Sequence, residues 1–208
     1  AGGTLTVNAG TQVFTQGAGL VGNPGAFITG GTFALQVNGI VAGAGTRTLQ
    51  VNDGALGTDL TITSTIVDGT GLQSVGIVKN GFGTLELGGS TPNTLTGTTT
   101  VNEGELRLNK TGGSALAGPL TIGNNDVTSG FSGSDVVQIL QSNQLPDYLA
   151  LVTITSTGAL LLNGNTETIG VADAQNALSM QASSTLNLGG GTLTINGNIA
   201  TDTNTGAG

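Results

Sequence analysis

The side chains best suited to chemistry in this sequence are three carboxylates within residues 86–105. Glu103 and Glu105 are two positions apart, and Glu86 would lie near Glu105 if the two residues stood on adjacent coils. A glycosidase needs two facing carboxylates about 5 to 9.5 Å apart, so a catalytic pair is conceivable. The alternative, which we favour, is that these are solvated side chains at a strand edge with Arg107 or Lys110 as partners.

Other catalytic groups are scarce. The chain contains no His and no Cys, which removes the usual general base and the nucleophilic triads. Parallel β-helix enzymes that cleave acidic polysaccharides need clustered Asp residues, and the Asp residues here are isolated. They are Asp53, Asp59, Asp68, Asp126, Asp135, Asp147, Asp173 and Asp202. Four scattered basic residues give a poor grip on a polyanion. The sequence therefore predicts a protein that is not an enzyme, with no catalytic residue and no cofactor.

Possible ligand motifs are also weak. Residues 130–137 half match the calcium-binding nonapeptide, but its ions lie between successive coils and require tandem copies, and only one copy is present. Asn124-Asn125-Asp126 is typical of a loop. The glycine clusters at residues 81–83 and 189–191 neither open a helix nor precede a Lys, so they are turns rather than phosphate loops. We expect no metal site.

The aromatic residues are too few and too dispersed for a carbohydrate-binding platform. We expect them to pack in the core or to fill corners. They are Phe14, Phe27, Phe33, Phe82, Phe131 and Tyr148.

Composition points to an all-β fold. Of 208 residues, 38 are Gly, only 8% are charged and 37% are hydrophobic, a balance that argues against disorder. There is no Gly-X-Y period, which excludes collagen. The net charge of −8 repels nucleic acid, and no apolar run approaches the roughly 20 residues of a membrane-spanning helix. We therefore expect neither nucleic acid nor membrane insertion.

Short segments of alternating apolar and polar residues recur along the chain with the period of a half-buried strand. They are residues 4–8, 32–35, 49–52, 60–63, 84–87, 100–102, 105–108, 120–122, 152–155, 160–163, 185–188 and 192–196. Residues 134–151 depart from the pattern and are predicted to form a strand followed by an excursion at Pro146. Residues 171–178 contain helix-permissive alanines in a segment too short for a secure assignment.

Asn and Gly separate many of these strands, and both tolerate left-handed backbone angles. The turns are residues 8–10, 38–39, 52–54, 80–81, 102–104, 163–164 and 196–197. An Asn-Gly pair is consistent with an antiparallel hairpin or with a solenoid corner at which Asn side chains stack. The even spacing of the strands favours corners.

Imperfect repetition is the main signal. Residues 2–8, Gly-Gly-Thr-Leu-Thr-Val-Asn, return almost unchanged as residues 190–196. Repeats that cannot each bury an apolar face gain a core by stacking, as in solenoids. We predict one elongated domain over residues 1–208, with eight to ten coils of about 20 to 25 residues and a flexible tail at residues 201–208.

Residues 78–108 contain Lys79-Asn80-Gly81-Phe82-Gly83-Thr84-Leu85-Glu86-Leu87, and later Asn93-Thr94-Leu95-Thr96-Gly97 and Gly104-Glu105-Leu106-Arg107-Leu108. This stretch resembles the autotransporter-associated β-strand repeat, also called the passenger-associated transport repeat. It departs from that pattern at Leu95, where an aromatic residue is usual, and in the spacer Ser90-Thr91-Pro92.

The resemblance implies a right-handed parallel β-helix within a secreted or surface-attached bacterial protein. From the elongated shape of such a solenoid we expect a structural building block of an extracellular fibre. An adhesin that binds a receptor or glycan is the alternative, and a polysaccharide-degrading enzyme is a more distant one. Neither terminus resembles a polar cap, and uncapped ends invite pairing with another chain. We therefore also expect end-to-end self-association.

Overall fold

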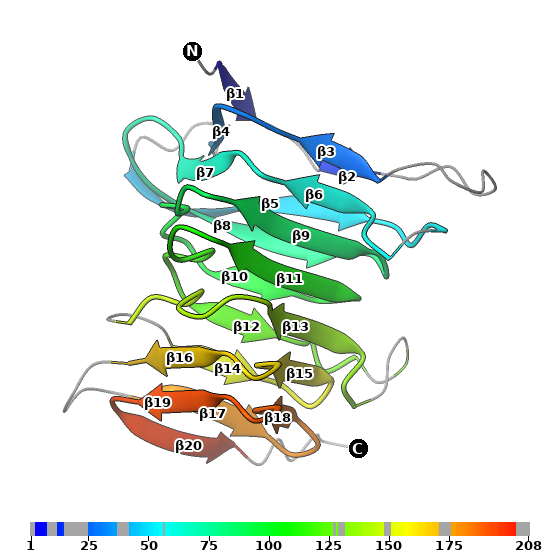
Figure 1. Cartoon of the computed structure of the whole chain (residues 1–208), viewed down its shortest axis with the longest axis vertical. Coiled ribbons are helices and arrows are strands. Elements are labelled where there is room, and N and C mark those ends of the chain that lie inside the picture. The colour runs from blue at the N-terminus through cyan, green and yellow to red at the C-terminus, as the bar shows by residue number, and fades with distance from the viewer. Residues whose placement is uncertain are drawn as a thin grey trace.

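The computed structural model describes residues 3–7, 12–14, 25–36, 42–55, 57–126, 128, 132–147, 151–170 and 176–202. Within these residues the protein is all-β and contains no helix. Strands from successive passes of the chain stack on one another in layers, from β1 at one end to β20 at the other (Figure 1). All the described strand pairs are parallel. The Asn-Gly segments within the described residues are therefore corners and not hairpins, as predicted.

An eight-stranded sheet runs the length of the stack. Its strands, in spatial order, are β2 (Gln12–Phe14), β5 (Ala42–Val51), β8 (Leu72–Asn80), β10 (Thr99–Val101), β12 (Leu120–Ile122), β14 (Val152–Ile154), β17 (Asn176–Gln181) and β20 (Asn198–Asp202).

A seven-stranded sheet forms another side. Its strands are β3 (Ala26–Ile28), β6 (Leu60–Ile62), β9 (Thr84–Gly89), β11 (Glu105–Lys110), β13 (Asp135–Ile139), β15 (Gly158–Leu161) and β18 (Thr185–Asn187).

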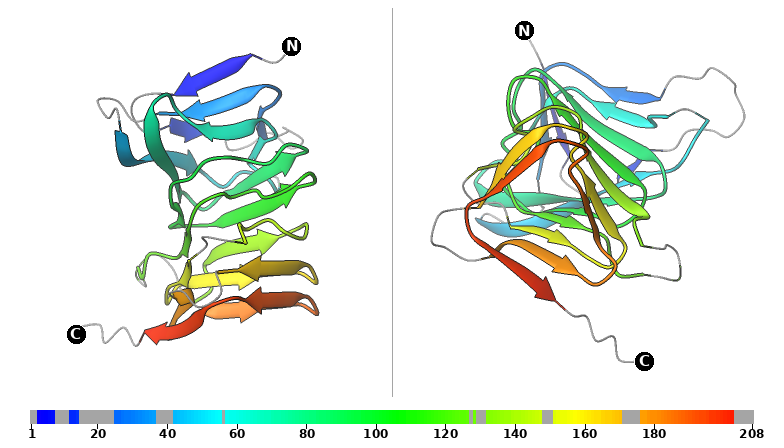
Figure 2. Two further views of the ribbon diagram at one scale, coloured as in Figure 1. Left: turned by 90° about the vertical axis from the view of Figure 1, so that its left-hand side faces the viewer. Right: turned by 60° about the horizontal axis from the view of Figure 1, so that its bottom comes forward.

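The segments that connect a strand of the seven-stranded sheet to the next strand of the eight-stranded sheet form what we call the third side. Near one end it holds a three-stranded sheet of β1 (Thr4–Val7), β4 (Thr32–Leu35) and β7 (Thr65–Asp68), and near the other it holds β16 (Thr166–Ile169) and β19 (Thr192–Ile195). Between them, residues 90–98, 111–119 and 140–147 cross the third side without a strand. Figure 2 shows the layers from the side and obliquely along the stack.

The core consists of columns of aliphatic side chains, one from each layer. In the seven-stranded sheet the register partners Leu60, Leu85, Leu106, Val137 and Leu160 succeed one another, and all are buried. Burial alternates along these strands, so one face of each strand contributes to the columns. Burying such a side chain contributes roughly 1.5–3 kcal/mol, and the columns therefore account for much of the stability of the stack.

The predicted strands all coincide or overlap with observed ones. Residues 134–147 contain strand β13 and then chain without a strand, as expected, and residues 148–150 lie outside the described residues. Pro146 itself is buried. The alanine-containing segment enters strand β17 at Asn176, and its earlier residues 171–175 lie outside the described residues.

The predicted corners use left-handed backbone at Gly81, Gly104, Asn163 and Gly164. At the first two corners the predicted Asn stacking is also present, since Asn102 Nδ2 donates to Asn80 Oδ1 over 2.9 Å. Residues 52–54 and 196–197 turn without a left-handed residue. The turns at residues 8–10 and 38–39 lie outside the described residues.

Two numerical expectations need correction. The layers are not uniformly 20 to 25 residues apart: Asn80 and Asn102 are 22 residues apart, whereas Asn109 and Gln141, also on successive layers, are 32 apart. The longer coil contains the excursion of residues 123–134 between β12 and β13. The predicted flexible tail is also wrong at its first two residues, because Thr201 and Asp202 belong to β20, and residues 203–208 lie outside the described residues.

Corner glycines set how closely two layers approach. Gly97 is buried on the third side, and its N–H donates to the Val75 carbonyl of the preceding layer over 3.1 Å. A Cβ at Gly97 would overlap the backbone of Val75 and Gly76, which cannot move away without breaking the ladder. Only glycine fits this position.

We therefore expect Gly97→Ala to destabilise the protein by about 1–3 kcal/mol through overpacking. Gly57→Ala is the matched control, because a Cβ there meets no atom within 4 Å, and its effect should be neutral or slightly stabilising. Urea unfolding followed by circular dichroism measures both. Equal unfolding midpoints for the two variants would contradict the close approach at Gly97.

Candidate functional site

The groups with the most unusual environments are buried polar side chains in two clusters. One, the Lys79 cluster, consists of Asp59, Lys79, Glu103 and Asp135 at the corner between the eight-stranded and seven-stranded sheets. The other, the third-side cluster, consists of Ser64, Asn93, Lys110, Gln144 and Glu167. Apart from Glu103, which is half-buried, the side chains of both clusters are buried.

Lys79 lies in an aliphatic column of the eight-stranded sheet. Its register partners are Leu49 and Val101, and its side chain is fully buried between them. The ammonium donates to the carbonyls of Gly81 and Glu103, over 2.6 and 2.7 Å. Lys79 thus joins the corners of two successive layers.

Burial lowers the pKa of Lys79 to about 8, against the opposing attraction of nearby carboxylates, of which Glu103 acts most strongly. The Glu103 carboxylate accepts a hydrogen bond from the Gly81 N–H over 2.6 Å. Asp59 accepts from the N–H groups of Gly54 and Thr84, over 2.9 and 2.8 Å. The carboxylates of this cluster therefore hold backbone at the corner.

Asp135 completes the Lys79 cluster. Burial raises the pKa of its carboxyl group, although hydrogen bonds from Thr157 and Ser134 oppose the shift. Its Oδ2 atom has no hydrogen-bond partner. An unpartnered buried carboxylate oxygen is costly, so this position destabilises the core.

The third-side cluster occupies the part of the stack where strands are interrupted. Asn93 accepts from the Ile66 N–H and donates to the Ala115 carbonyl, both over 2.8 Å. Gln144 bonds both the N–H and the carbonyl of Lys110, over 2.7 and 2.9 Å. These amides replace the backbone ladder where successive segments cannot pair.

Glu167 also binds backbone groups on the third side, through a carboxylate instead of an amide. Its two carboxylate oxygens accept from the N–H groups of Gln144 and Leu145, over 2.7 and 3.1 Å. Burial raises its pKa to about 7, despite these hydrogen bonds. Burial also lowers the pKa of Lys110 to about 8, and its ammonium donates to the Ser64 carbonyl over 3.1 Å. Both groups are thus engaged in holding backbone.

The three carboxylates that could have formed a catalytic pair are engaged separately. Glu105 pairs with Arg107 over 2.6 Å, as expected, and Glu86 accepts from Asn109 over 3.0 Å. Glu103 holds the Gly81 N–H, as described above. Lys110 is not their partner, because it lies on the inward face of β11 and is buried.

The remaining predicted features are dispersed. Within the described residues no group of three or more Asp or Glu side chains could hold a metal ion. The half-matched nonapeptide falls partly outside those residues, and Asn124-Asn125-Asp126 forms a loop in which Asn125 accepts from Ser156. Among the aromatic residues Phe33 is buried as predicted, but Phe27 and Phe82 are exposed, which corrects the prediction. The side chain of Phe14 is not described, and Phe131 and Tyr148 lie outside the described residues.

Lys79, Lys110 and Glu167 were missed as buried groups, although the strand alternation contained the signal. Val75, Ile77 and Lys79 alternate on one face of β8, as Leu106, Leu108 and Lys110 do on β11. Period-2 counting therefore places both ammonium groups inward. Lysine side chains are mostly exposed to solvent, and this general preference pointed the other way.

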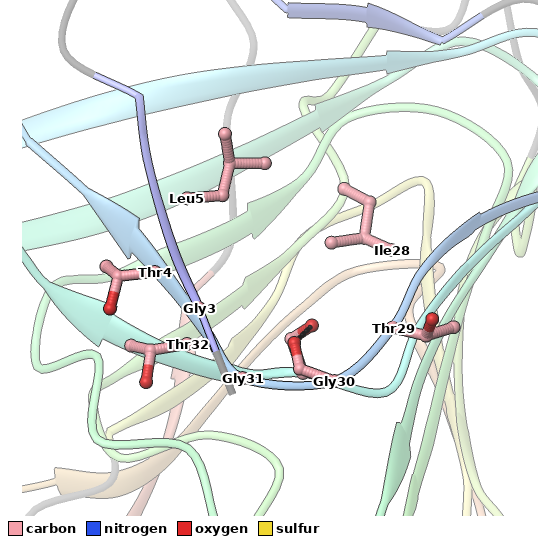
Figure 3. Close-up of a pocket in the computed structure, with 9 residues that line it drawn as sticks. Gly3, Thr4, Leu5, Ile28, Thr29, Gly30, Gly31 and Thr32 are labelled. Carbon is pink, nitrogen blue, oxygen red and sulfur yellow. Dashed lines mark hydrogen bonds between the residues drawn. The ribbon is translucent and has the colours of Figure 1, made fainter. Parts of the chain in front are cut away.

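Two surface hollows are lined by described residues. One, of about 400 Å³, lies at the β1 end of the stack and is lined by glycines, threonines, Ser64, Leu5 and Ile28 (Figure 3). The other, of about 460 Å³, is lined by small residues around Gly97 and by Pro119. Neither lining contains a titratable side chain.

No protein-family model, curated protein or solved structure matches this chain. Among the residues that the structure describes, no helix is long and apolar enough to cross a membrane.

The raised pKa of Glu167 has a consequence for stability. Between pH 4.5 and about 7 the folded state holds the Glu167 proton more tightly than the unfolded state does, so stability from this group is present at low pH and is lost as the pH rises through 7. We expect the unfolding free energy of the wild type to fall by up to about 3 kcal/mol more over this range than that of Glu167→Gln.

Denaturant unfolding at several pH values measures this difference. Glu86→Gln makes the same chemical change at a half-buried side chain on the outer face of β9, and should follow the wild type. Parallel pH profiles for the wild type and Glu167→Gln would rule out a buried, titrating Glu167.

Lys79 and Lys110 are the only lysines in the chain, so their titrations can be observed directly. With lysine labelled at Cε, nuclear magnetic resonance should show two titrations with midpoints near pH 8, because burial disfavours both ammonium ions. Lys110→Met assigns the two signals. A midpoint near 10.5 for either lysine would mean that its amine is in water.

Proposed function

We propose that the chain is a non-enzymatic structural unit, a right-handed parallel β-helix that serves as a building block of a bacterial surface or secreted fibre. The carrying observation is the continuous eight-stranded parallel sheet, whose layers bury columns of mainly apolar side chains. The right hand follows from the strong preference of parallel crossover connections for that hand. The resemblance of residues 78–108 to the autotransporter-associated repeat supports export to the cell surface.

The engagement of the polar groups supports a mechanical role. The unusual titratable groups hold backbone between layers, and Glu86, Glu103 and Glu105 bind separate partners. Such an arrangement stiffens a rod. It leaves no described pair of carboxylates aimed at a common substrate.

The surface charge supports an extracellular structural protein that does not bind nucleic acid. Three of the four basic residues, Arg47, Lys79 and Lys110, are buried, and Arg107 is paired with Glu105. Of the ten carboxylates whose burial the structure describes, seven are half-buried or exposed, so the exterior is acidic. Such a surface repels phosphates.

A second function, adhesion, is favoured by two exposed aromatic residues. Phe27 and Phe82 are 61% and 62% exposed, and aromatic side chains commonly supply contacts to ligands. Glycan-array binding that is lost in Phe82→Ser would favour this function over a purely structural one.

Immunogold labelling of cells that produce the protein tests the structural proposal. We expect gold particles along extracellular fibres on intact cells, without permeabilisation, because a fibre subunit must lie outside the cell. Preimmune serum provides the control. Labelling that requires permeabilised cells would contradict an extracellular fibre.

A further inference from the structure

The two ends of the stack expose side chains that belong to core columns. Leu5 is 52% exposed, yet its column partners Phe33 and Ile66 are buried. Ile199 at the opposite end is 60% exposed, yet Leu178 in the same column is buried. These residues are exposed because their columns stop, not because they face outward. Each end is a cross-section of the core.

Charged residues are scarce at both ends, although β20 pairs with β17 across a register shift between Asn176 and Leu178. Natural edges are protected by charges, proline, bulges or covering loops. Residues 1–46 contain no charged residue, and residues 174–208 contain only Asp202. All the other charged residues lie between these two regions. The two end layers therefore meet with little repulsion, because Asp202 in β20 is the one charged residue that they bring together.

The near-identical heptapeptides lie at equivalent places on the two ends. β1 and β19 both belong to the third side, and each is the outermost strand of its sheet. Threonine stacks on threonine in both sheets, at Thr4 with Thr32 and at Thr166 with Thr192. A Thr192 to Thr4 contact between molecules would extend both columns in the register already used within the chain.

We propose that the β19 end of one molecule pairs with the β1 end of a second copy, in parallel register, with Thr192 opposite Thr4 and Ile195 opposite Val7. This inference rests on the proposed function and names its assembly step. Leu193 would then lie on Leu5, beside the hollow of about 400 Å³ shown in Figure 3. β20 would lie on β2, which continues the eight-stranded sheet from one molecule to the next.

The contact joins unlike surfaces, so it leaves one free end on each side and propagates into an open filament. At the junction one position of the seven-stranded sheet is not filled by a described strand, because β19 and β20 extend one layer beyond β18.

Arginine substitutions at single ends test the proposal. Leu5→Arg blocks one end and Ile199→Arg blocks the other, while Phe82→Arg places the same charge at an exposed corner away from both ends. Sedimentation velocity and negative-stain electron microscopy of the 208-residue chain measure assembly. Circular dichroism and the melting temperature verify that each variant folds.

We expect the wild type and Phe82→Arg to form oligomers that lengthen with concentration, and each end variant alone to remain monomeric. An equimolar mixture of Leu5→Arg and Ile199→Arg should form a one-to-one dimer and nothing longer, because each variant retains one intact end. Comparing the assembly of the wild type with that of either end variant is sufficient to test end pairing. The test therefore remains valid if one of the two variants misfolds.

A wild type that stays monomeric at every concentration overturns the inference. So does assembly that Phe82→Arg abolishes and the end variants preserve, since that would be lateral association. These results are separable from the test of the proposed function: a monomeric chain that still labels extracellular fibres would refute end pairing and leave the structural role supported.

Discussion

The structure depends on one constraint, which is that each layer must lie in parallel register on the layer before it. This register satisfies the backbone groups and also aligns side chains of similar size and polarity in columns. Leu60, Leu85 and Leu106 show the result within the core, and Asn80 and Asn102 show it at a corner. The same constraint explains Gly97, because a side chain there would separate two layers that must be in hydrogen-bonding contact.

Buried polar groups appear where the register cannot be kept. On the third side, strands are absent between β7 and β16 in the described chain, and Asn93, Gln144 and Glu167 bond the backbone groups that a ladder would otherwise satisfy. The cost is that charge enters the core, which raises the pKa of Glu167 and lowers that of Lys110. Most of the titratable groups with shifted pKa values are therefore buried because they form hydrogen bonds with irregular backbone.

A stack of this kind has no intrinsic end. Its columns stop at Leu5 and Ile199, and among the described residues no strand pairs with the outer edges of the end strands. The repeated heptapeptide therefore has a structural explanation, since the strands within its two copies, β1 and β19, both belong to the third side. That explanation is compatible with stacking between molecules, because equivalent positions in successive layers require similar residues.

The sequence by itself determined the all-β class, the positions of most strands and the use of Asn and Gly at corners, because these depend on period-2 alternation and local backbone preference. Only the tertiary structure decided which layers are neighbours, that Lys79 and Lys110 bind carbonyls within the core, and that Glu167 holds Gln144 and Leu145. It also decided that Phe82 is exposed and Phe33 is buried. These features arise from contacts between residues more than 20 positions apart or from the path of a single corner, and variable coil lengths hide such contacts from any local pattern.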